Sequence, residues 1–180
     1  MSTNNNQQAG QSVDQSTHFE IERFLVKEAR ALDEERFHDW LNNMLTQDVM
    51  YQLPIQEVRQ RRDNKVLGNS QTTYIYNDNF GMLSMRVARL DTGIVWAEDP
   101  KVRNRRIVTN IDAEWAEVEG EIAVRSVITL FRSRMQRDQA THYGIREDRL
   151  RKVDGQWRLA HRVITLDQRV TLDKNLHVLF

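Results

Sequence analysis

The chain of 180 residues has no cysteine and no excess charge of either sign, with 26 Lys plus Arg against 26 Asp plus Glu. Without cysteine it cannot form a disulfide, a thiolate nucleophile, a zinc ribbon or a Cys-ligated iron–sulfur cluster. Balanced charge argues against a nucleic-acid binder, because binding to phosphates needs excess Lys and Arg. The apolar runs are far shorter than the roughly 20 residues that span a bilayer, and no export leader opens the chain. We therefore expect a cytoplasmic protein that binds neither nucleic acid nor membrane.

The composition divides the chain into a short arm and one domain. Residues 1–16 are rich in Asn, Gln and Ser, and such a segment buries too little apolar surface to offset its ordering entropy. We predict a disordered arm there. Thr17 and Glu20 have the spacing of a helix capping box. Residues 17–180 are therefore expected to form a single domain that begins with a helix, a length typical of one domain.

Helical patterns come first along the chain and strand patterns follow. Residues 18–45 lack Pro and Gly and place Ile21, Leu25 and Leu32 on one helical stripe. A second short helix is predicted over 37–45, a strand over 49–53 and a third helix over about 79–91. From 105 to 166 the residues alternate as in strands, and Asp154-Gly155 is a strong hairpin signal. Consecutive hairpins predict an antiparallel sheet, and helices followed by strands predict an α+β fold.

Motifs that carry chemistry are few. Neither glycine-rich nucleotide loop is present, nor is the G-x-S-x-G nucleophile motif. Glu35 and His38 form one E-x-x-H, whereas carboxylate-bridged di-iron bundles need two plus two further Glu. His142 and His161 lie on strands that are predicted to be neighbours, and we interpret them as structural residues rather than metal ligands. The two basic clusters, around residues 59–62 and 101–106, indicate a solvated face or a protein interface.

Glu28 is the anomalous residue of the first helix, because its carboxylate falls in the middle of the apolar stripe. A carboxylate in such surroundings is either paired with a cation or has a raised pKa. One interpretation is a general base in a pocket under the sheet. The interpretation we favour is a buried ion pair with an arginine from the sheet.

Several short motifs occur in a fixed order along the chain. They are Glu28–Asp33 with Phe37 and Trp40-Leu41, Asp48–Ile55, Tyr76–Phe80 with Arg86–Leu90, Trp96–Pro100 with Arg103, Arg106 and Val108–Asn110, Gly144–Asp148 with Leu150-Arg151, and Asp173–Leu176. Together they resemble the motifs of the small (beta) subunits of Rieske-type aromatic-ring-hydroxylating dioxygenases, of the naphthalene and biphenyl dioxygenase kind. The resemblance extends from Phe24 to Phe180. Lys101-Val102 departs from it, since Pro-Ser is common there.

The resemblance implies a fold, an assembly and a division of labour. The fold would be a cone like that of nuclear transport factor 2 (NTF2) and the cystatins, with N-terminal helices packed on a strongly curved antiparallel sheet. In such bacterial enzymes the large (alpha) subunit holds a Rieske [2Fe-2S] cluster and a mononuclear iron. Three large and three small subunits form an alpha3beta3 hexamer, and electrons pass from NADH through a reductase and often a ferredoxin. The holoenzyme adds O2 to an aromatic ring as a cis-dihydrodiol, and the large subunit selects the substrate.

For this chain the resemblance implies a non-catalytic structural subunit with no cofactor, no metal and no catalytic residue of its own. We expect Arg103 and Arg106 to organise carboxylates, either Glu28 or residues of the large subunit. Residues proposed for contacts with other subunits lie in three parts of the chain: Tyr51, Pro54, Trp96, Asp99, Pro100, Arg103, Arg106, Leu176 and Phe180.

Two other classes of function fit the same predicted fold. A stand-alone isomerase or dehydratase of the NTF2-like type would use a carboxylate or histidine in its cavity. Candidate groups for such an enzyme are Glu28, Asp48, Tyr51 and His161. A ligand-binding or scaffolding module without catalysis is the third class.

Overall fold

The structure is a computed structural model, and it describes residues 9–55, 73–91, 102–134, 138–168 and 178–180. The helical elements are α1 (Gln15–Asp33), α2 (Phe37–Asp39), the π-helix η2 (Trp40–Met44) and α3 (Phe80–Asp91). The strands are β1 (Leu45–Pro54), β2 (Tyr74–Asn79), β3 (Arg103–Trp115), β4 (Glu121–Arg134), β5 (Asp138–Val153) and β6 (Gln156–Leu166). No helix in these ranges is both long and apolar enough to cross a membrane.

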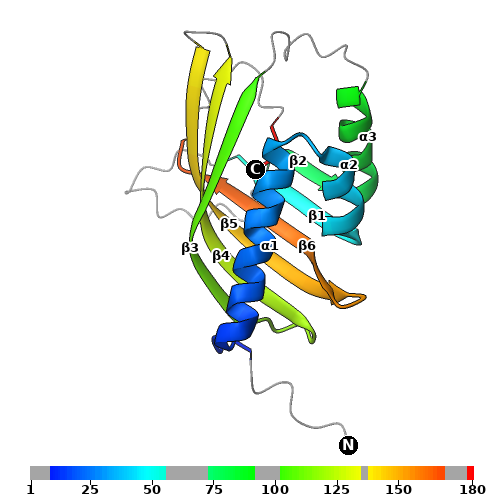
Figure 1. The fold of residues 1–180 in the computed structure, drawn as a ribbon, viewed down its shortest axis with the longest axis vertical. Helices are drawn as coiled ribbons and strands as arrows, with labels where there is room; N and C mark the ends of the chain where they lie inside the picture. Colours follow the sequence, from blue (N-terminus) through cyan, green and yellow to red (C-terminus); the bar gives the residue numbers. More distant parts are fainter. Residues whose placement is uncertain (1–8, 56–72, 92–101, 135–137, 169–177) are drawn as a thin grey trace, which may run out of the picture.

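The strands form one six-stranded sheet in the order β2-β1-β6-β5-β4-β3. The predicted antiparallel pairing holds for β1–β2, β3–β4, β4–β5 and β5–β6, but β1 and β6 are parallel. Parallel pairing needs a long connection, and here the chain between β1 and β6 contains all the other strands. The sheet is therefore mixed, although helices that precede and cover it give the predicted α+β fold. Figure 1 shows the long strands β3, β4 and β5 bending as they pass α1.

The first helix begins earlier than predicted. Asp14, not Thr17, is its N-cap: the Asp14 carboxylate accepts hydrogen bonds from the Thr17 backbone N–H (3.0 Å) and hydroxyl (2.6 Å). Just before it, main-chain hydrogen bonds join residues 10–13 to the end of β3, and Ser12 bridges Glu114. The predicted disordered arm is thus wrong for residues 10–16, because main-chain pairing does not depend on apolar side chains. Residues 1–8 lie outside the described part.

The turn between β5 and β6 matches its sequence prediction. Asp154 and Gly155 both have positive φ, at 52° and 75°, which the two-residue turn that suits the sheet's twist requires. The end of the first helical region differs from its prediction. The region predicted as one short helix over 37–45 divides into α2 and the wider π-turns of η2, which places the Trp40 side chain wholly inside the domain.

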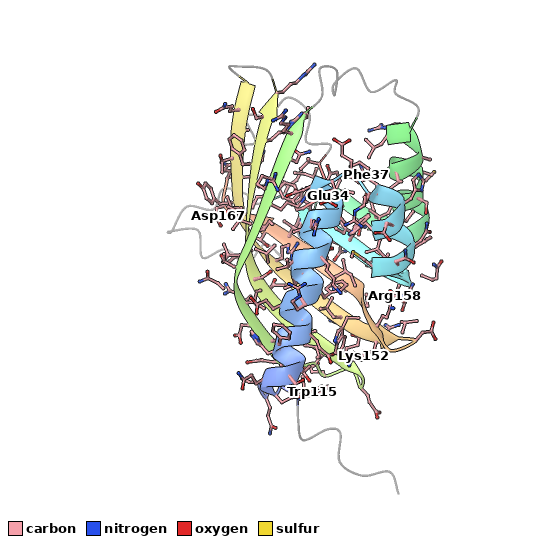
Figure 2. The ribbon with its side chains drawn as sticks, viewed as in Figure 1. Glu34, Phe37, Trp115, Lys152, Arg158 and Asp167 are labelled. Carbon is pink, nitrogen blue, oxygen red and sulfur yellow. The ribbon has the colours of Figure 1, made fainter. Side chains whose placement is uncertain are left out.

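The core lies between α1 and one face of the sheet. Figure 2 shows side chains filling this space, with Trp115 beside the first turns of α1 and Glu34 at its other end. The predicted stripe of Ile21, Leu25 and Leu32 is buried there. The opposing sheet face contributes further fully buried apolar residues: Ile122, Ile128, Leu130, Leu150, Leu159 and Ile164. Burial of each large side chain stabilises the fold by roughly 1.5–3 kcal/mol.

Gly144 is required by close backbone packing between β5 and β6. A Cβ atom at this position would lie 2.6 Å from the Thr165 carbonyl oxygen, so the strands would have to separate. We expect Gly144→Ala to lower the free energy of unfolding by about 1–3 kcal/mol, measured by urea denaturation. Gly81→Ala is the matched control in α3, because its Cβ would meet nothing closer than 3.4 Å. Equal stability of the two variants would contradict this account of Gly144.

Candidate functional site

A group of four charged side chains lies at the centre of the domain. Glu28 comes from α1, Arg146 and Asp148 from β5, and Arg162 from β6, and all four side chains are fully buried. We call this group the buried charge cluster. Helical spacing directs Glu28 inward with the apolar stripe. Alternation along β5 directs Arg146 and Asp148 to the same face as the buried Leu150.

Arg162 connects the two carboxylates of the cluster. Its Nη1 and Nη2 donate to Glu28 Oε1 and Oε2 at 2.8 and 2.7 Å. Its Nε and Nη2 donate to Asp148 Oδ1 and Oδ2, both at 2.7 Å. Its Nη1 also donates to the main-chain oxygen of Phe180 at 2.9 Å. The planar guanidinium therefore pairs with both carboxylates through two hydrogen bonds each, the geometry in which Arg–carboxylate pairs are strongest.

The remaining bonds of the cluster are less complete. Trp40 Nε1 donates to Glu28 Oε1 at 3.1 Å, which fixes the indole against the carboxylate. Arg146 Nη1 reaches Glu28 Oε2 at 3.4 Å, and its Nε lies 3.8 Å from Asp148 Oδ2. Arg146 Nε and Nη2 have no hydrogen-bond partner, and neither does Oγ of Ser126, which is opposite Arg146 on β4. Arg146 therefore balances the charge of the cluster more than it organises it.

The electrostatics keep both members of the main pair charged. Burial alone would raise the pKa of Glu28, but the charges of Arg162 and Arg146 and the hydrogen bonds of Arg162 and Trp40 hold it below its ordinary value. Burial works against the charge of Arg162 as well, yet Asp148 and Glu28 raise its pKa well above the ordinary value. Arg146 differs, because burial and the neighbouring Arg162 lower its pKa. Glu28 is thus an ionised, fully paired carboxylate.

Glu28 forms a buried ion pair with Arg162, an arginine of the sheet, and a buried pair of this kind is the interpretation that the sequence favours. A general base needs a free lone pair within hydrogen-bond reach of a substrate proton. Both oxygens of Glu28 already accept charged hydrogen bonds, and neither pocket described below has Glu28 in its lining. The sequence prediction missed Asp148, Arg146 and Arg162 as members, although strand alternation with Leu150 and Ile164 could have placed them inside.

Three of the proposed subunit contacts belong to the interior of this chain. The Tyr51 and Phe180 side chains are fully buried, and Arg106 is 6% exposed. Arg106 Nη1 pairs with Asp33 Oδ1 at 2.7 Å, and its Nε donates to the Leu179 carbonyl oxygen at 3.0 Å. The carboxylate it organises is thus Asp33, not Glu28. As predicted interface side chains these three are wrong, because alternation along β1 and β3 turns Tyr51 and Arg106 inward.

The other predicted residues are dispersed. Arg103 is exposed and Pro54 is half-buried, and both stay candidates for contacts with another subunit. The remaining contact candidates lie outside the described residues: Trp96, Asp99, Pro100 and Leu176.

The four groups considered for a stand-alone enzyme do not converge. Glu28 and Tyr51 lie inside the domain, whereas the Asp48 side chain is 62% exposed and pairs with Arg151. His161 is half-buried on the opposite sheet face, where its Nε2 lies 3.0 Å from Gln52 Oε1. Burial and the nearby Arg149 lower the pKa of His161.

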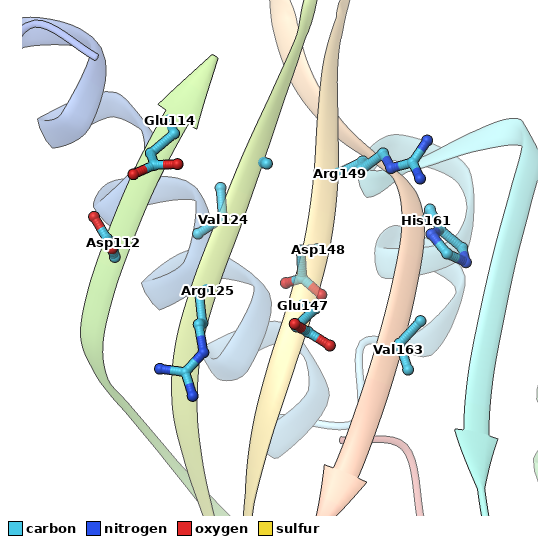
Figure 3. Close-up of a pocket in the computed structure, with 10 residues that line it drawn as sticks. Asp112, Glu114, Val124, Arg125, Glu147, Asp148, Arg149, His161 and Val163 are labelled. Carbon is cyan, nitrogen blue, oxygen red and sulfur yellow. The ribbon is translucent and has the colours of Figure 1, made fainter. Parts of the chain in front are cut away.

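A pocket of about 380 Å3 lies across β3, β4, β5 and β6, and His161 is part of its lining. Figure 3 shows its side chains on the strands, with α1 behind the sheet. Opposite charges face each other between strands in this pocket, because Arg125 pairs in register with Asp112 and with Glu147. Such cross-strand pairs neutralise one another. A second pocket, of about 430 Å3, lies between α1 and β3, and its lining includes Val26, Asp33 and Arg105.

The next question is whether the side chains of this protein could bind a metal centre. A Rieske cluster requires two Cys and two His, and the 180 residues contain no Cys. Within the described residues no group of three or more His, Asp or Glu is placed to hold a metal ion. The residues of this chain therefore do not fit the Rieske cluster of the enzymes that the sequence resembles.

Comparison with known folds places this α+β domain among proteins of the NTF2-like and cystatin-like class. A cystatin-like protein of Nostoc punctiforme superposes with a TM-score of 0.58 at 16% identity, over 89% of this chain and 98% of its own. The beta subunit of benzoate 1,2-dioxygenase from Burkholderia mallei gives 0.68 at 20% identity, over 94% and 99%. A chain of naphthalene 1,2-dioxygenase gives 0.86 at 26% identity, over 96% and 90%.

The family follows from the sequence as well. Residues 27–173 match the family model described as the ring hydroxylating beta subunit. This chain belongs to the family of ring-hydroxylating dioxygenase beta subunits, as its motifs predicted.

Proposed function

We propose that this chain is the non-catalytic, structural subunit of the terminal oxygenase of an aromatic-ring-hydroxylating dioxygenase. It would hold large subunits together in an alpha3beta3 hexamer in the bacterial cytoplasm. The Rieske [2Fe-2S] cluster and the mononuclear iron would belong to the large subunit. Electrons from NADH would reach that subunit through a reductase and a ferredoxin, and the product would be the cis-dihydrodiol of an aromatic hydrocarbon.

The observation that supports the proposal is that the central carboxylate of this chain, a member of the family, is buried and paired. In a cavity enzyme the central carboxylate must be accessible and free to take a proton. Here Glu28 is fully buried and bonded to Arg162 and Trp40. The bonds between Glu28 and Arg162 also join α1 to β6. We therefore infer that the domain is rigid enough to act as a support. Rigidity suits a subunit whose role is to position others, since interfaces of permanent assemblies bury large preformed surfaces.

Co-expression with a Rieske-type large subunit tests this role. We expect size-exclusion chromatography to give a hexamer, and iron analysis to find the metal in the large subunit only. The chain purified alone should contain no iron and oxidise no arene. Arene oxidation, or isomerase or dehydratase activity, by the isolated chain would contradict the proposal and favour the stand-alone enzyme.

The exposed interface candidate Arg103 enters the same experiment as a charge reversal. Arg103→Glu should reduce the amount of hexamer if the start of β3 contacts another subunit. Arg23→Glu is the matched control, because Arg23 is exposed on α1 and was not proposed as a contact. Equal hexamer yields for the two variants would remove Arg103 from the interface but would leave the assembly itself untouched.

A further inference from the structure

The face of the sheet turned away from α1 has a band of uncharged side chains across β3, β4 and β5. Three large apolar side chains of this neutral band are exposed: Ile107 at 52%, Phe131 at 38% and Tyr143 at 50%. The strand register places smaller uncharged residues among them, namely Thr109, Val127, Thr129, Thr141 and Ile145. In a chain of which 29% of the residues are charged, a band with aromatic residues and no charge has the composition of a protein interface.

Charges of opposite sign border the neutral band at its two ends. At one end lies Arg105, whose side chain is 73% exposed. Its guanidinium is 3.6 Å from the Asp33 carboxylate, too far for a hydrogen bond, and so it can pair with another carboxylate. At the other end Asp112 and Glu147 flank Arg125 in register, and all three are exposed. This second row has a net negative charge, which complements Arg105.

The shape of this face is also complementary to itself. Phe131 projects at the basic end of the band, whereas Arg125 at the acidic end lines the pocket of about 380 Å3 that Figure 3 shows. Both residues belong to β4 and are six positions apart, so they lie about 20 Å from each other along the strand. The pocket has room for a phenyl ring, since a cavity of about 150 Å3 holds benzene. A guanidinium beside such a ring attracts its face.

We propose that two copies of this chain pair face to face through the neutral band, related by a two-fold axis at its middle. The axis lies between the two sheets and at right angles to the strands, so that β4 of one copy runs antiparallel over β4 of the other. Each Phe131 ring then reaches the pocket of the other copy, and each Arg105 faces Asp112 of the other copy. Every contact occurs twice, as in a dimer that uses the same surface on both subunits.

The area of this face sets the expected strength of the dimer. Four strands about 4.8 Å apart and about ten residues long, at 3.3 Å per residue, give roughly 600 Å2 per copy. Stable complexes bury about 800 Å2 per partner, so we expect a dissociation constant on the order of 10 μM. The inference goes beyond the proposed function, because a hexamer with a three-fold axis alone contains no two-fold contact between small subunits. The dimer would be the state of the chain before it binds a large subunit.

Sedimentation velocity of the isolated full chain tests the proposal. We expect mainly dimer at about 100 μM and mainly monomer at about 1 μM. Arg105→Asp and Asp112→Arg should each weaken the dimer about tenfold or more, because each variant brings like charges together twice. A mixture of these two variants should associate as the wild type does, because the mixed dimer again has two pairs of opposite charge. Arg23→Asp is the control, since Arg23 is exposed on α1, and it should leave the dimer unchanged.

Phe131→Ser removes the projecting ring without changing any charge and should weaken the dimer about tenfold. Phe19→Ser is its matched control, because Phe19 is 61% exposed on α1, away from the neutral band. Circular dichroism should show that both variants are folded.

The proposal is overturned if the wild type sediments as a monomer or as a trimer at about 100 μM. It is also overturned if the mixture of the two charge variants associates no better than either variant alone. Should a charge variant fail to fold, the comparison of Phe131→Ser with Phe19→Ser decides, and equal association of these two refutes the proposed surface. All of these outcomes concern the isolated chain, so they are independent of whether it forms a hexamer with a large subunit.

Discussion

Glu28→Gln is expected to lower the free energy of unfolding by about 3–5 kcal/mol, because it leaves a buried guanidinium without its full counter-charge. Arg162 keeps Asp148, but Arg146 loses the carboxylate oxygen that lies 3.4 Å from its Nη1. For a domain of this size the loss corresponds to a fall in melting temperature of roughly 6–20 °C. Urea denaturation of the isolated chain, followed by circular dichroism, measures it.

Glu22→Gln on the exposed side of the same helix is the matched control and should leave stability within about 0.5 kcal/mol of the wild type. The hexamer yield of Glu28→Gln should fall together with its stability. If the variant instead melts like the wild type while an activity of the isolated chain disappears, Glu28 acts as a base and the structural interpretation fails.

The buried charge cluster shows how far a single sequence leads. Glu28 could be predicted as paired because helical periodicity is local, and placing a carboxylate in an apolar stripe requires a cation nearby. Its partner could not be chosen, since Arg162 lies 134 positions away and many arginines were available. Arg146 and Asp148 alternate with the exposed Glu147 and Arg149. Because all four are charged, only the alternation with Leu150 distinguishes the two buried residues from an ordinary charged surface.

Other differences have a similar physical origin. The pairing of residues 10–13 with β3 uses main-chain groups, so the polar composition of that segment gives no sign of it. The parallel pairing of β1 and β6 joins the first strand to the last. Turn residues could not predict it, because they indicate only the pairing of strands that follow one another in the sequence. Alternation along β3 turns Arg106 inward, but its partner Asp33 at the end of α1 lies 73 positions away and could not be chosen from the sequence. In each case a long-range contact, not local propensity, decided the outcome.

Arg162→Leu should reverse the pH dependence of stability. In the wild type the pKa of Glu28 is lower in the folded chain than in the unfolded chain. Its pairing therefore stabilises the fold above the ordinary glutamate pKa of about 4.3 and is lost as the pH falls through the lower, folded value. Stability of the wild type should thus be level near neutral pH and decrease in acid.

In the variant two buried carboxylates share one poorly placed cation, because Arg146 is 3.4 Å from Glu28 and 3.8 Å from Asp148. Burial then dominates, and one carboxylate takes a proton with a pKa above its ordinary value. The folded chain binds a proton that the unfolded chain releases, so stability should rise as the pH falls from about 7 to about 5. At pH 7 we expect the free energy of unfolding of the variant to be about 3–5 kcal/mol lower than that of the wild type. Urea denaturation at each pH measures it.

Arg125→Leu is the control, because Arg125 is exposed on β4 and its removal should not change the sign of the pH dependence. A second variant isolates the cause. Adding Glu28→Gln to Arg162→Leu removes one of the two competing carboxylates and restores a neutral pair of Asp148 and Arg146. In the Arg162→Leu background, Glu28→Gln should then lower the free energy of unfolding much less than it does in the wild type, or even raise it. It should also abolish the rise in stability at acid pH. Full additivity of the two losses would mean that the cluster does not act as one electrostatic unit.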